Sequence, residues 1–305
     1  MRFAAIGRTR TLLNSIRLLI ERGHTLSCIA TSKTPSYCGT SPEEFDRIAK
    51  DHHVPLIYGS ALEHSLGVLN YTRTDVAISV NWPTLITGPL LSTFKHGILN
   101  AHAGDLPRYR GNAVANWAIL NGESQIGLAI HRMVEELDAG PIYQKSFFQL
   151  NSQTYIGDVY DWIEQETPEL FARTLDSLPS GTVSPLDQSN SRVTPLRAFP
   201  RKPEDSRIDW SNSNEYNHRL IRASSRPLSG AFATTESDET IIIWRAELYA
   251  PPYEFLAVPG QVCENIEGDP LIACGSGMLR LTEVTDAQEQ DARPIILSSM
   301  RNRLR

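Results

Sequence analysis

The chain has 305 residues, long enough to bury a large core and more typical of two domains than of one. Its 29 Lys and Arg against 35 Asp and Glu give a formal charge of -6, whereas proteins that bind by neutralising phosphates usually carry a basic surplus, so nucleic acid is disfavoured as a partner. Four scattered cysteines, early arginines and the lack of a long apolar run predict a reduced, cytoplasmic protein without a membrane partner.

The chain opens with a strand, a helix and a second strand. Residues 3–6 and 25–30 are apolar, and apolar residues recur at helical spacing between them. This order predicts an α/β fold with a doubly wound, Rossmann-like parallel sheet. The first loop has one glycine and is not the dinucleotide fingerprint. Backbone amides at a helix start can still hold a phosphate, so Gly7, Arg8 and Arg10 are candidate substrate contacts, with a plain turn as the alternative.

The next segments continue the same sheet. Residues 41–44 (Ser-Pro-Glu-Glu) are typical of a helix start, and 54–58 predicts a third strand. The β-branched, apolar run 74–80 predicts a central strand covered on both faces. It ends at 81–86, which contains a tryptophan and two aliphatic residues, at the sheet edge where open α/β sheets bind ligands. The adjacent histidines at 52–53 diverge in a helix, and we predict no metal site.

Polar residues follow the strand that ends near residue 100. Side chains two apart on a strand share a face, so Asn100 and His102 can face one cleft. An amide that donates to an oxygen gaining charge, next to an imidazole that accepts a proton, suits acyl transfer to an amine. Asp138, in a later loop, can set the imidazole tautomer or relay the proton. No serine or cysteine nucleophile lies nearby, which predicts direct transfer between two bound substrates.

The rest of the chain contains further helices and strands around one linker. Proline interrupts helices, so Pro168 predicts a break in a helix spanning 154–178. The Ser-, Pro-, Gly- and Asn-rich stretch 180–200 has no periodicity and is the best linker candidate. The other predicted elements are a helix at 113–120, a strand pair at 127–133 and 142–148, and strands at 240–244 and 279–284.

Four motifs occur in a fixed order between residues 100 and 140. They are Asn100-Ala-His102, Leu106-Pro-Arg-Tyr-Arg-Gly111, Asn121-Gly-Glu123 with Gly127, and Asp138-Ala-Gly140. Together they resemble the folate-dependent formyltransferases. The resemblance implies that Asn100, His102 and Asp138 are catalytic, that the formyl donor is 10-formyltetrahydrofolate, and that no metal takes part.

The resemblance also implies where the donor binds. It puts Trp82 and Ile86 against the pterin ring, although Trp82 packing into the core fits its sequence context equally well. It further implies that the loop containing Glu136, Leu137 and Asp138 reads the hydrogen-bonding edge of the pterin with its backbone.

The acceptor is expected to meet two other segments. Tyr109 and Arg110 belong to the Leu-Pro motif, and Asn116-Trp117 matches a pair common in relatives that act on sugar nucleotides. We therefore expect these four residues to contact the acceptor substrate.

The carboxyl-terminal part resembles the second domain of methionyl-tRNA formyltransferases and of aminoarabinose-pathway sugar formyltransferases. The resemblance implies a small open β-barrel of the OB-like type. We predict a catalytic domain at 1–185, a linker at 186–202 and the barrel domain at 203–305. A homodimer is compatible with this pattern.

Three features favour a small acceptor over tRNA. The segment 31–42 is short and holds one lysine, where the tRNA enzymes carry a longer basic insertion. Residues 102–105 read His-Ala-Gly-Asp in place of their usual Ser-Leu pair, and 112–117 fits the sugar-nucleotide branch. We predict N-formylation of a nucleotide-linked amino sugar, in lipopolysaccharide or glycan biosynthesis, with methionyl-tRNA formyltransferase as the alternative.

Three other classes of protein stay open at this point. A Rossmann-type oxidoreductase matches the opening strands but lacks the glycine fingerprint. A catalytically silent sugar-nucleotide sensor would keep the pocket without turnover. A hydrolase that releases formate from the same donor would share the Asn, His and Asp set.

Overall fold

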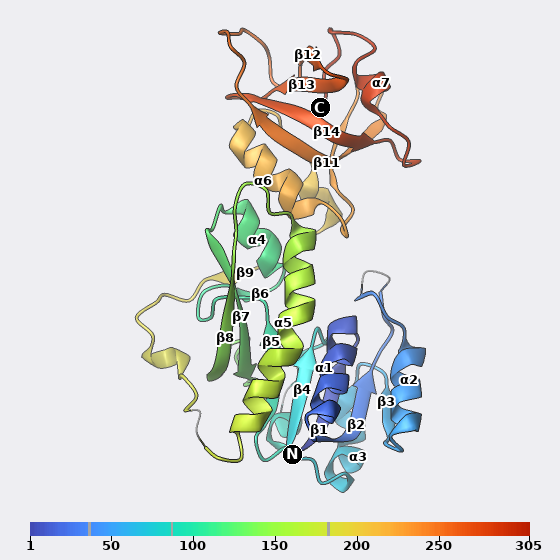
Figure 1. Cartoon of the computed structure of the whole chain (residues 1–305), viewed down its shortest axis with the longest axis vertical. Helices are drawn as coiled ribbons and strands as arrows, with labels where there is room; N and C mark the ends of the chain where they lie inside the picture. Colours follow the sequence, from blue (N-terminus) through green and yellow to red (C-terminus); the bar gives the residue numbers. More distant parts are fainter. Residues whose placement is uncertain (36–37, 87, 182–183) are drawn as a thin grey trace. The chain divides into compact units, whose positions relative to one another are not determined.

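The structure is a computed structural model that describes residues 1–35, 38–86, 88–181 and 184–305 (Figure 1). Residues 36–37 of the short segment 31–42 and 182–183 of the linker stretch lie outside this description. The contacts divide the chain into two compact units. Unit 1 comprises Met1–Val114, Gln125–Gln149 and Tyr160–Phe199, and unit 2 comprises Ala115–Ser124, Leu150–Val159 and Pro200–Arg305. The domain boundaries drawn from the sequence stay a prediction.

Unit 1 is built on a seven-stranded sheet with the strand order β3-β2-β1-β4-β5-β7-β8. The first five strands in that order run parallel, and β7 and β8 are antiparallel. The predicted α/β class with a parallel sheet is therefore confirmed. The strands are β1 (Arg2–Gly7), β2 (Thr25–Thr31), β3 (Leu56–Tyr58), β4 (Val76–Val80), β5 (Ile98–His102), β7 (Gln125–Arg132) and β8 (Ile142–Gln149), with a small parallel pair of β6 (Arg110–Gly111) and β9 (Arg197–Ala198) beside them.

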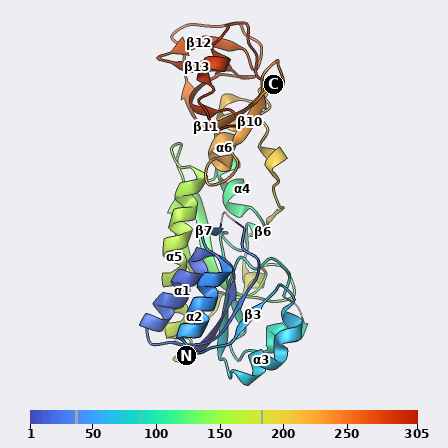
Figure 2. The same cartoon turned by 90° about the vertical axis from the view of Figure 1, so that its right-hand side faces the viewer.

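Helices cover both faces of this sheet (Figure 2). One cluster of buried side chains includes residues of the helices α1 (Arg10–Glu21), α2 (Pro42–Asp51) and α5 (Ile156–Ser177). The other includes residues of α3 (Leu66–Tyr71) and of the segment after β4. Each fully buried aliphatic or aromatic side chain contributes about 1.5–3 kcal/mol. The predicted start of α2 is confirmed, because the N–H of Ser41 donates to Glu44 at 3.4 Å.

Helix α5 corrects one prediction, because it continues through Pro168 without a break. Proline removes one backbone hydrogen bond, but three side chains beyond it, Leu170, Phe171 and Leu175, are fully buried in the unit 1 core. Their burial outweighs the local cost of the proline. Neither α5 nor any other helix in the described part of the chain has the length and apolarity needed to cross a bilayer.

Unit 2 contains a five-stranded antiparallel sheet with the order β10-β11-β14-β13-β12. Helix α6 packs against β11. This antiparallel sheet is compatible with the small barrel predicted from the sequence. The elements are α4 (Val114–Leu120), α6 (Asn214–Ser224), β10 (Ala231–Thr234), β11 (Thr240–Tyr249), β12 (Val262–Ile266), β13 (Asp269–Ala273), β14 (Met278–Thr285) and α7 (Arg293–Ile296).

Candidate active site

Asn100 lies in a row of residues that crosses three neighbouring strands. Strand pairing places it beside Ser79 of β4 on one side and His131 of β7 on the other. Strand β5 continues to His102, as expected, so Asn100 and His102 project from the same face of the sheet. The row lies near the carboxyl ends of the parallel strands, the edge at which open α/β sheets bind ligands.

His102 is buried and held from two sides. Its Nε2 donates to the backbone carbonyl of Tyr109 at 2.6 Å, and its Nδ1 lies 3.6 Å from Oδ2 of Asp138. A carbonyl only accepts, so this arrangement requires the proton on Nε2. Burial lowers the pKa of His102, and the nearby Asp138 charge offsets that effect only in part. The ring is therefore neutral at neutral pH and able to accept a proton.

Asp138 lies in the loop between β7 and β8, in the left-handed backbone region that Asp tolerates (φ 51°). Its carboxylate accepts a hydrogen bond from the N–H of Gly111 at 2.8 Å and lies 3.5 Å from Nε2 of His131. Burial by itself would raise the pKa of Asp138. The hydrogen bond with His131, the electrostatic interactions with the imidazoles of His102 and His131, and the Gly111 N–H together lower it to about 2. Asp138 is thus a buried carboxylate at neutral pH.

The loop after β5 leaves no room for a side chain at Gly104. A Cβ there would lie 2.4 Å from the Tyr109 carbonyl oxygen and 2.6 Å from Nε2 of His102. The same loop is tied to β8, because Lys145 donates to Asp105 at 2.7 Å and to the carbonyl of Leu106. The Tyr109 carbonyl and the His102 ring are consequently held against each other.

The Asp138 loop is anchored by Gln188, which the sequence places in the linker stretch. Gln188 is buried; its side-chain N–H groups donate to the carbonyls of Asp138 at 2.8 Å and Gly140 at 2.7 Å, and its oxygen accepts from Arg110. Sequence reasoning missed this residue because it lies in a polar stretch without periodicity. A buried glutamine with all these partners fixes the position of the carboxylate loop.

Two family models match this chain. Residues 59–175 match the formyl transferase model, and residues 201–296 match the model of the formyl transferase C-terminal domain. The chain belongs to the formyltransferase family. The first matched region contains Asn100, His102 and Asp138, whose catalytic roles stay a prediction.

The similar proteins are named for different formyl acceptors. The chain is 28% identical over 289 residues to a methionyl-tRNA formyltransferase of Citrifermentans bemidjiense, covering 93% of this chain and 88% of the relative. WlaRD, a sugar 3N-formyl transferase, shares the fold with a TM-score of 0.67 at 16% identity over 95% of this chain and 99% of that chain. An N-formyltransferase from Helicobacter canadensis has a TM-score of 0.66 at 16% identity, with 93% and 99% covered.

Two of the residues expected to contact folate lie in or against an apolar cluster on the Asn100 face of the sheet. Ile86 is buried in that cluster and Trp82, half-buried, packs against it. The Trp82 indole nitrogen has no hydrogen-bond partner in the described residues. The N–H groups of Glu136 and Leu137 likewise make no backbone hydrogen bond there. The indole nitrogen is itself buried, and contact of these groups with folate stays a prediction.

The first loop contains the residues expected to bind a phosphate. Gly7 is packed against the end of β4, since a Cβ there would lie 2.2 Å from the carbonyl oxygen of Val80. Arg8 donates to the carbonyl of Lys33 at 3.2 Å, and Arg10 to that of Gly39 at 2.6 Å. Both guanidinium groups therefore hydrogen-bond to backbone carbonyls of the segment that follows β2.

The residues expected to bind the acceptor lie in both units. Tyr109 is buried in unit 1, and Arg110 forms an ion pair with Glu136 at 2.6 Å. In unit 2, Asn116 donates to the carbonyl of Ala223 at 2.7 Å, and the Arg201 guanidinium lies 5.2 Å from the centre of the Trp117 ring. Asn116 is therefore tied to α6, and one face of the Trp117 ring is covered by Arg201.

His131 is a further residue of the site that sequence reasoning missed. It is 1% exposed and lies between Asn100 and Asp138. The signal was available, because alternation along the strand places His131 on the face opposite Leu128 and Ile130, which belong to the main core. A titratable side chain in that position interrupts an otherwise apolar strand.

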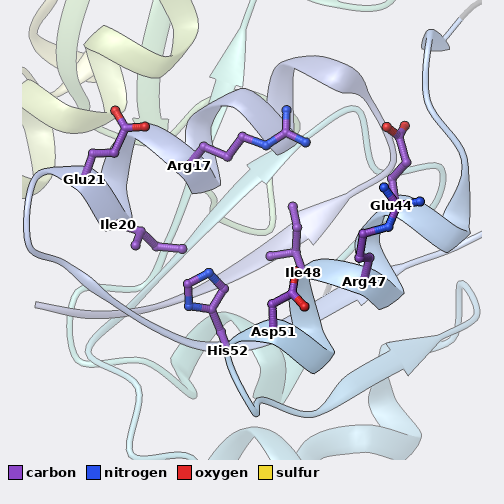
Figure 3. A pocket seen from close by; sticks show the side chains of 8 residues that line it. All are labelled: Arg17, Ile20, Glu21, Glu44, Arg47, Ile48, Asp51 and His52. Carbon is purple, nitrogen blue, oxygen red and sulfur yellow. The ribbon is translucent and has the colours of Figure 1, made fainter.

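A separate cavity of about 330 Å³ lies between α1 and α2 (Figure 3). Figure 3 shows Ile20 and Ile48 toward its centre, and the charged residues around them are Arg17, Glu21, Glu44, Arg47, Asp51 and His52. Charges of both signs are typical of a solvated surface, and the cavity contains none of the predicted site residues. We assign it no part in catalysis.

Proposed function

We propose that this protein transfers a formyl group from 10-formyltetrahydrofolate to the amino group of a nucleotide-linked amino sugar. The observation that carries the proposal is the arrangement around Asp138, where a buried carboxylate faces two imidazoles and one of them faces the Asn100 amide. Acyl transfer to nitrogen requires a proton acceptor for the amine and a donor for the oxygen that gains charge, and this set supplies both.

His102 is the base in this proposal. The attacking amine must be neutral when it reaches the formyl carbon, and it loses a proton as the new C–N bond forms. A neutral His102 with its proton on Nδ1, directed to Asp138, would present a bare Nε2 to that proton. In the structure the ring proton is on Nε2, which donates to Tyr109. Binding of the amine therefore has to displace this carbonyl, and the ring proton has to move from Nε2 to Nδ1, before Nε2 can act as the base.

Asn100 and Asp138 support the same transfer. The amide N–H of Asn100 would donate to the formyl oxygen as it gains negative charge, and Asp138 would stabilise the imidazolium that forms at His102. A carboxylate that stays ionised, with a pKa of about 2, can do this throughout the neutral range. The proton then passes to the nitrogen that loses the formyl group.

The residues around Trp82 fit a reduced folate. The donor supplies an activated formyl group. The apolar cluster with Ile86 suits a flat ring, and the N–H groups of Glu136 and Leu137, which make no backbone hydrogen bond in the described residues, suit its hydrogen-bonding edge. Two similar structures were crystallised with 5-N-formyl-THF and folinic acid, which supports this ligand class.

The charge of unit 2 supports a small acceptor. Its segment Pro200–Arg305 holds 12 Lys and Arg against 16 Asp and Glu, and tRNA binding depends largely on basic residues that meet phosphates. The similar structures named above act on a sugar amine or hold dTDP or a dTDP-linked amino sugar. Arg8 and Arg10 are the residues that we expect to meet the phosphates of such a nucleotide.

The decisive experiment compares acceptors directly. Purified protein is incubated with 10-formyltetrahydrofolate and either a panel of amino-sugar nucleotides or methionine-charged tRNA, and the formylated product is measured by mass spectrometry. We expect formylation of a sugar nucleotide and none of the tRNA. Formate released without any acceptor would instead identify a hydrolase.

The sequence relative supports a second candidate, methionyl-tRNA formyltransferase, because a protein of that name shares 28% identity over 93% of this chain. Formylation of charged tRNA with no product from any sugar nucleotide would establish this candidate and overturn the first.

A further inference from the structure

The proposed function leaves His131 without a role, although it contacts two of the three residues that carry the mechanism. Its Nε2 lies 3.3 Å from the Asn100 side-chain nitrogen and 3.5 Å from Oδ1 of Asp138. Its ring stands edge-on to that of His102, with 6.1 Å between the ring centres. His131 therefore joins the proposed oxyanion donor to the carboxylate.

The two neighbours make opposite demands on the same ring nitrogen. An amide nitrogen only donates, so it needs a bare Nε2, whereas an ionised carboxylate only accepts and needs Nε2–H. The other ring nitrogen, Nδ1, lies 3.2 Å from the carbonyl oxygen of Arg132, which is also an acceptor. Of these two acceptors the ionised carboxylate is the stronger, because a hydrogen bond to a charged group is favoured over one to a neutral carbonyl. This favours a His131 that donates from Nε2 toward Asp138.

A half-turn of the Asn100 amide removes the conflict. It exchanges the amide nitrogen and oxygen without moving the strand, so that one Nε2–H faces both the Asn100 oxygen and Asp138. The amide N–H₂ group then takes the place that the oxygen held. We propose that His131 is a positioning residue that keeps the Asn100 N–H₂ group turned toward the reacting formyl oxygen. This inference rests on the proposed function for the role of Asn100.

The tautomer can be tested without any turnover. We would record ¹⁵N-histidine NMR spectra of the full chain and assign the His131 ring by comparison with the His131→Leu variant. The expected result is a protonated Nε2 that couples to its own hydrogen. A bare Nε2 in the wild-type protein would overturn the positioning role.

Kinetics test the link to Asn100. We expect His131→Leu to lower kcat about 100-fold with little change in either KM, because the oxyanion donor loses its orientation. His131→Gln offers an amide N–H in place of Nε2–H and should recover kcat to within about ten-fold of the wild type. Equal losses in the Gln and Leu variants would show that no N–H at this position matters.

A double-mutant cycle separates positioning from simple loss of packing. If His131 acts through Asn100, His131→Leu should change kcat less than about three-fold in the Asn100→Ala background. If the losses in kcat of the two single variants multiplied in the double variant, the proposal would be contradicted. The matched control is His24→Leu, which removes another buried histidine of unit 1 that faces an aspartate and should leave kcat unchanged. Absence of formyl transfer by the wild type counts against the proposed function, whereas the NMR result judges His131 independently.

Discussion

Unit 1 contains buried histidines paired with aspartates at opposite ends of its parallel strands. At the carboxyl ends, His102 lies 3.6 Å from Asp138, whose side chain is 10% exposed. At the amino ends, His24 precedes β2 and lies 3.0 Å from Asp176 of α5, whose side chain is 46% exposed. The same two residue types thus face each other in two different surroundings.

The difference lies in how each carboxylate is solvated. Water reaches Asp176, so its charge is screened and the pair joins α5 to the start of β2 at little cost. Asp138 is buried, and His102, His131 and the Gly111 N–H compensate its charge. Burying an ion that has such internal partners does not by itself favour folding. The His24–Asp176 pair therefore has a structural role, and the more buried His102–Asp138 pair is the candidate for chemistry.

The largest expected effect is the loss of kcat on removing His102, compared with removing His24. His102→Ala should lower kcat by about 10²–10⁴-fold because the amine loses its base, while His24→Ala should leave kcat within about two-fold. Steady-state formyl transfer with a fixed donor concentration measures both. Similar losses in the two variants would remove the distinction between the pairs.

Next in size is Asn100→Ala, which removes the proposed donor to the formyl oxygen. The expected loss in kcat is roughly 100-fold or more, with the fold retained because Asn100 is only half-buried. Circular dichroism and thermal unfolding provide the folding control. Near-normal turnover in this variant would exclude the amide from the mechanism.

Gly104→Ala tests whether the His102 ring must stay where the structure has it. A Cβ at Gly104 would push on both Nε2 of His102 and the Tyr109 carbonyl, and a displacement of about 1 Å can cost about 10²-fold in rate. Gly67→Ala, at an exposed helical position where a Cβ meets nothing within 4 Å, is the matched control. Unchanged kcat in Gly104→Ala would show that the loop can adjust.

A smaller effect is expected in the pH dependence of kcat/KM, and its direction follows from the pKa of His102. Burial lowers the pKa of His102 below 6.5, and a base must be neutral, so kcat/KM should fall on the acid side only below that value. The Asp138 charge raises the pKa of His102. In Asp138→Asn that pKa should drop, so the fall of the residual kcat/KM on the acid side should shift to lower pH. A limb that moves upward or stays in place would contradict the assignment.

The smallest expected effect is on stability and concerns His24. Burial lowers its pKa in the folded state, so between that value and 6.5 the unfolded chain binds more protons and the wild type loses stability as pH falls. His24→Ala should cost about 1 kcal/mol at pH 7, and the difference from wild type should shrink toward pH 5. Urea unfolding at several pH values measures this. A difference that grows on acidification would contradict it.

Local patterns were sufficient for much of the site. The spacing of Asn100 and His102 predicted that both share a face, because side chains alternate along any strand, and strand β5 bears this out. The alternating runs on either side of Asp138 likewise predicted the β7–β8 hairpin and the loop that holds the carboxylate. These features depend only on residues close in the sequence.

Tertiary structure decided which groups complete the site. His131 lies beside Asn100 because β7 pairs with β5, and Gln188 reaches the Asp138 loop because a stretch that looks like a linker folds back onto it. Pro168 stays inside α5 because the core buries the residues beyond it. In each case the deciding free energy comes from contacts between segments distant in the sequence, which propensity and spacing do not encode.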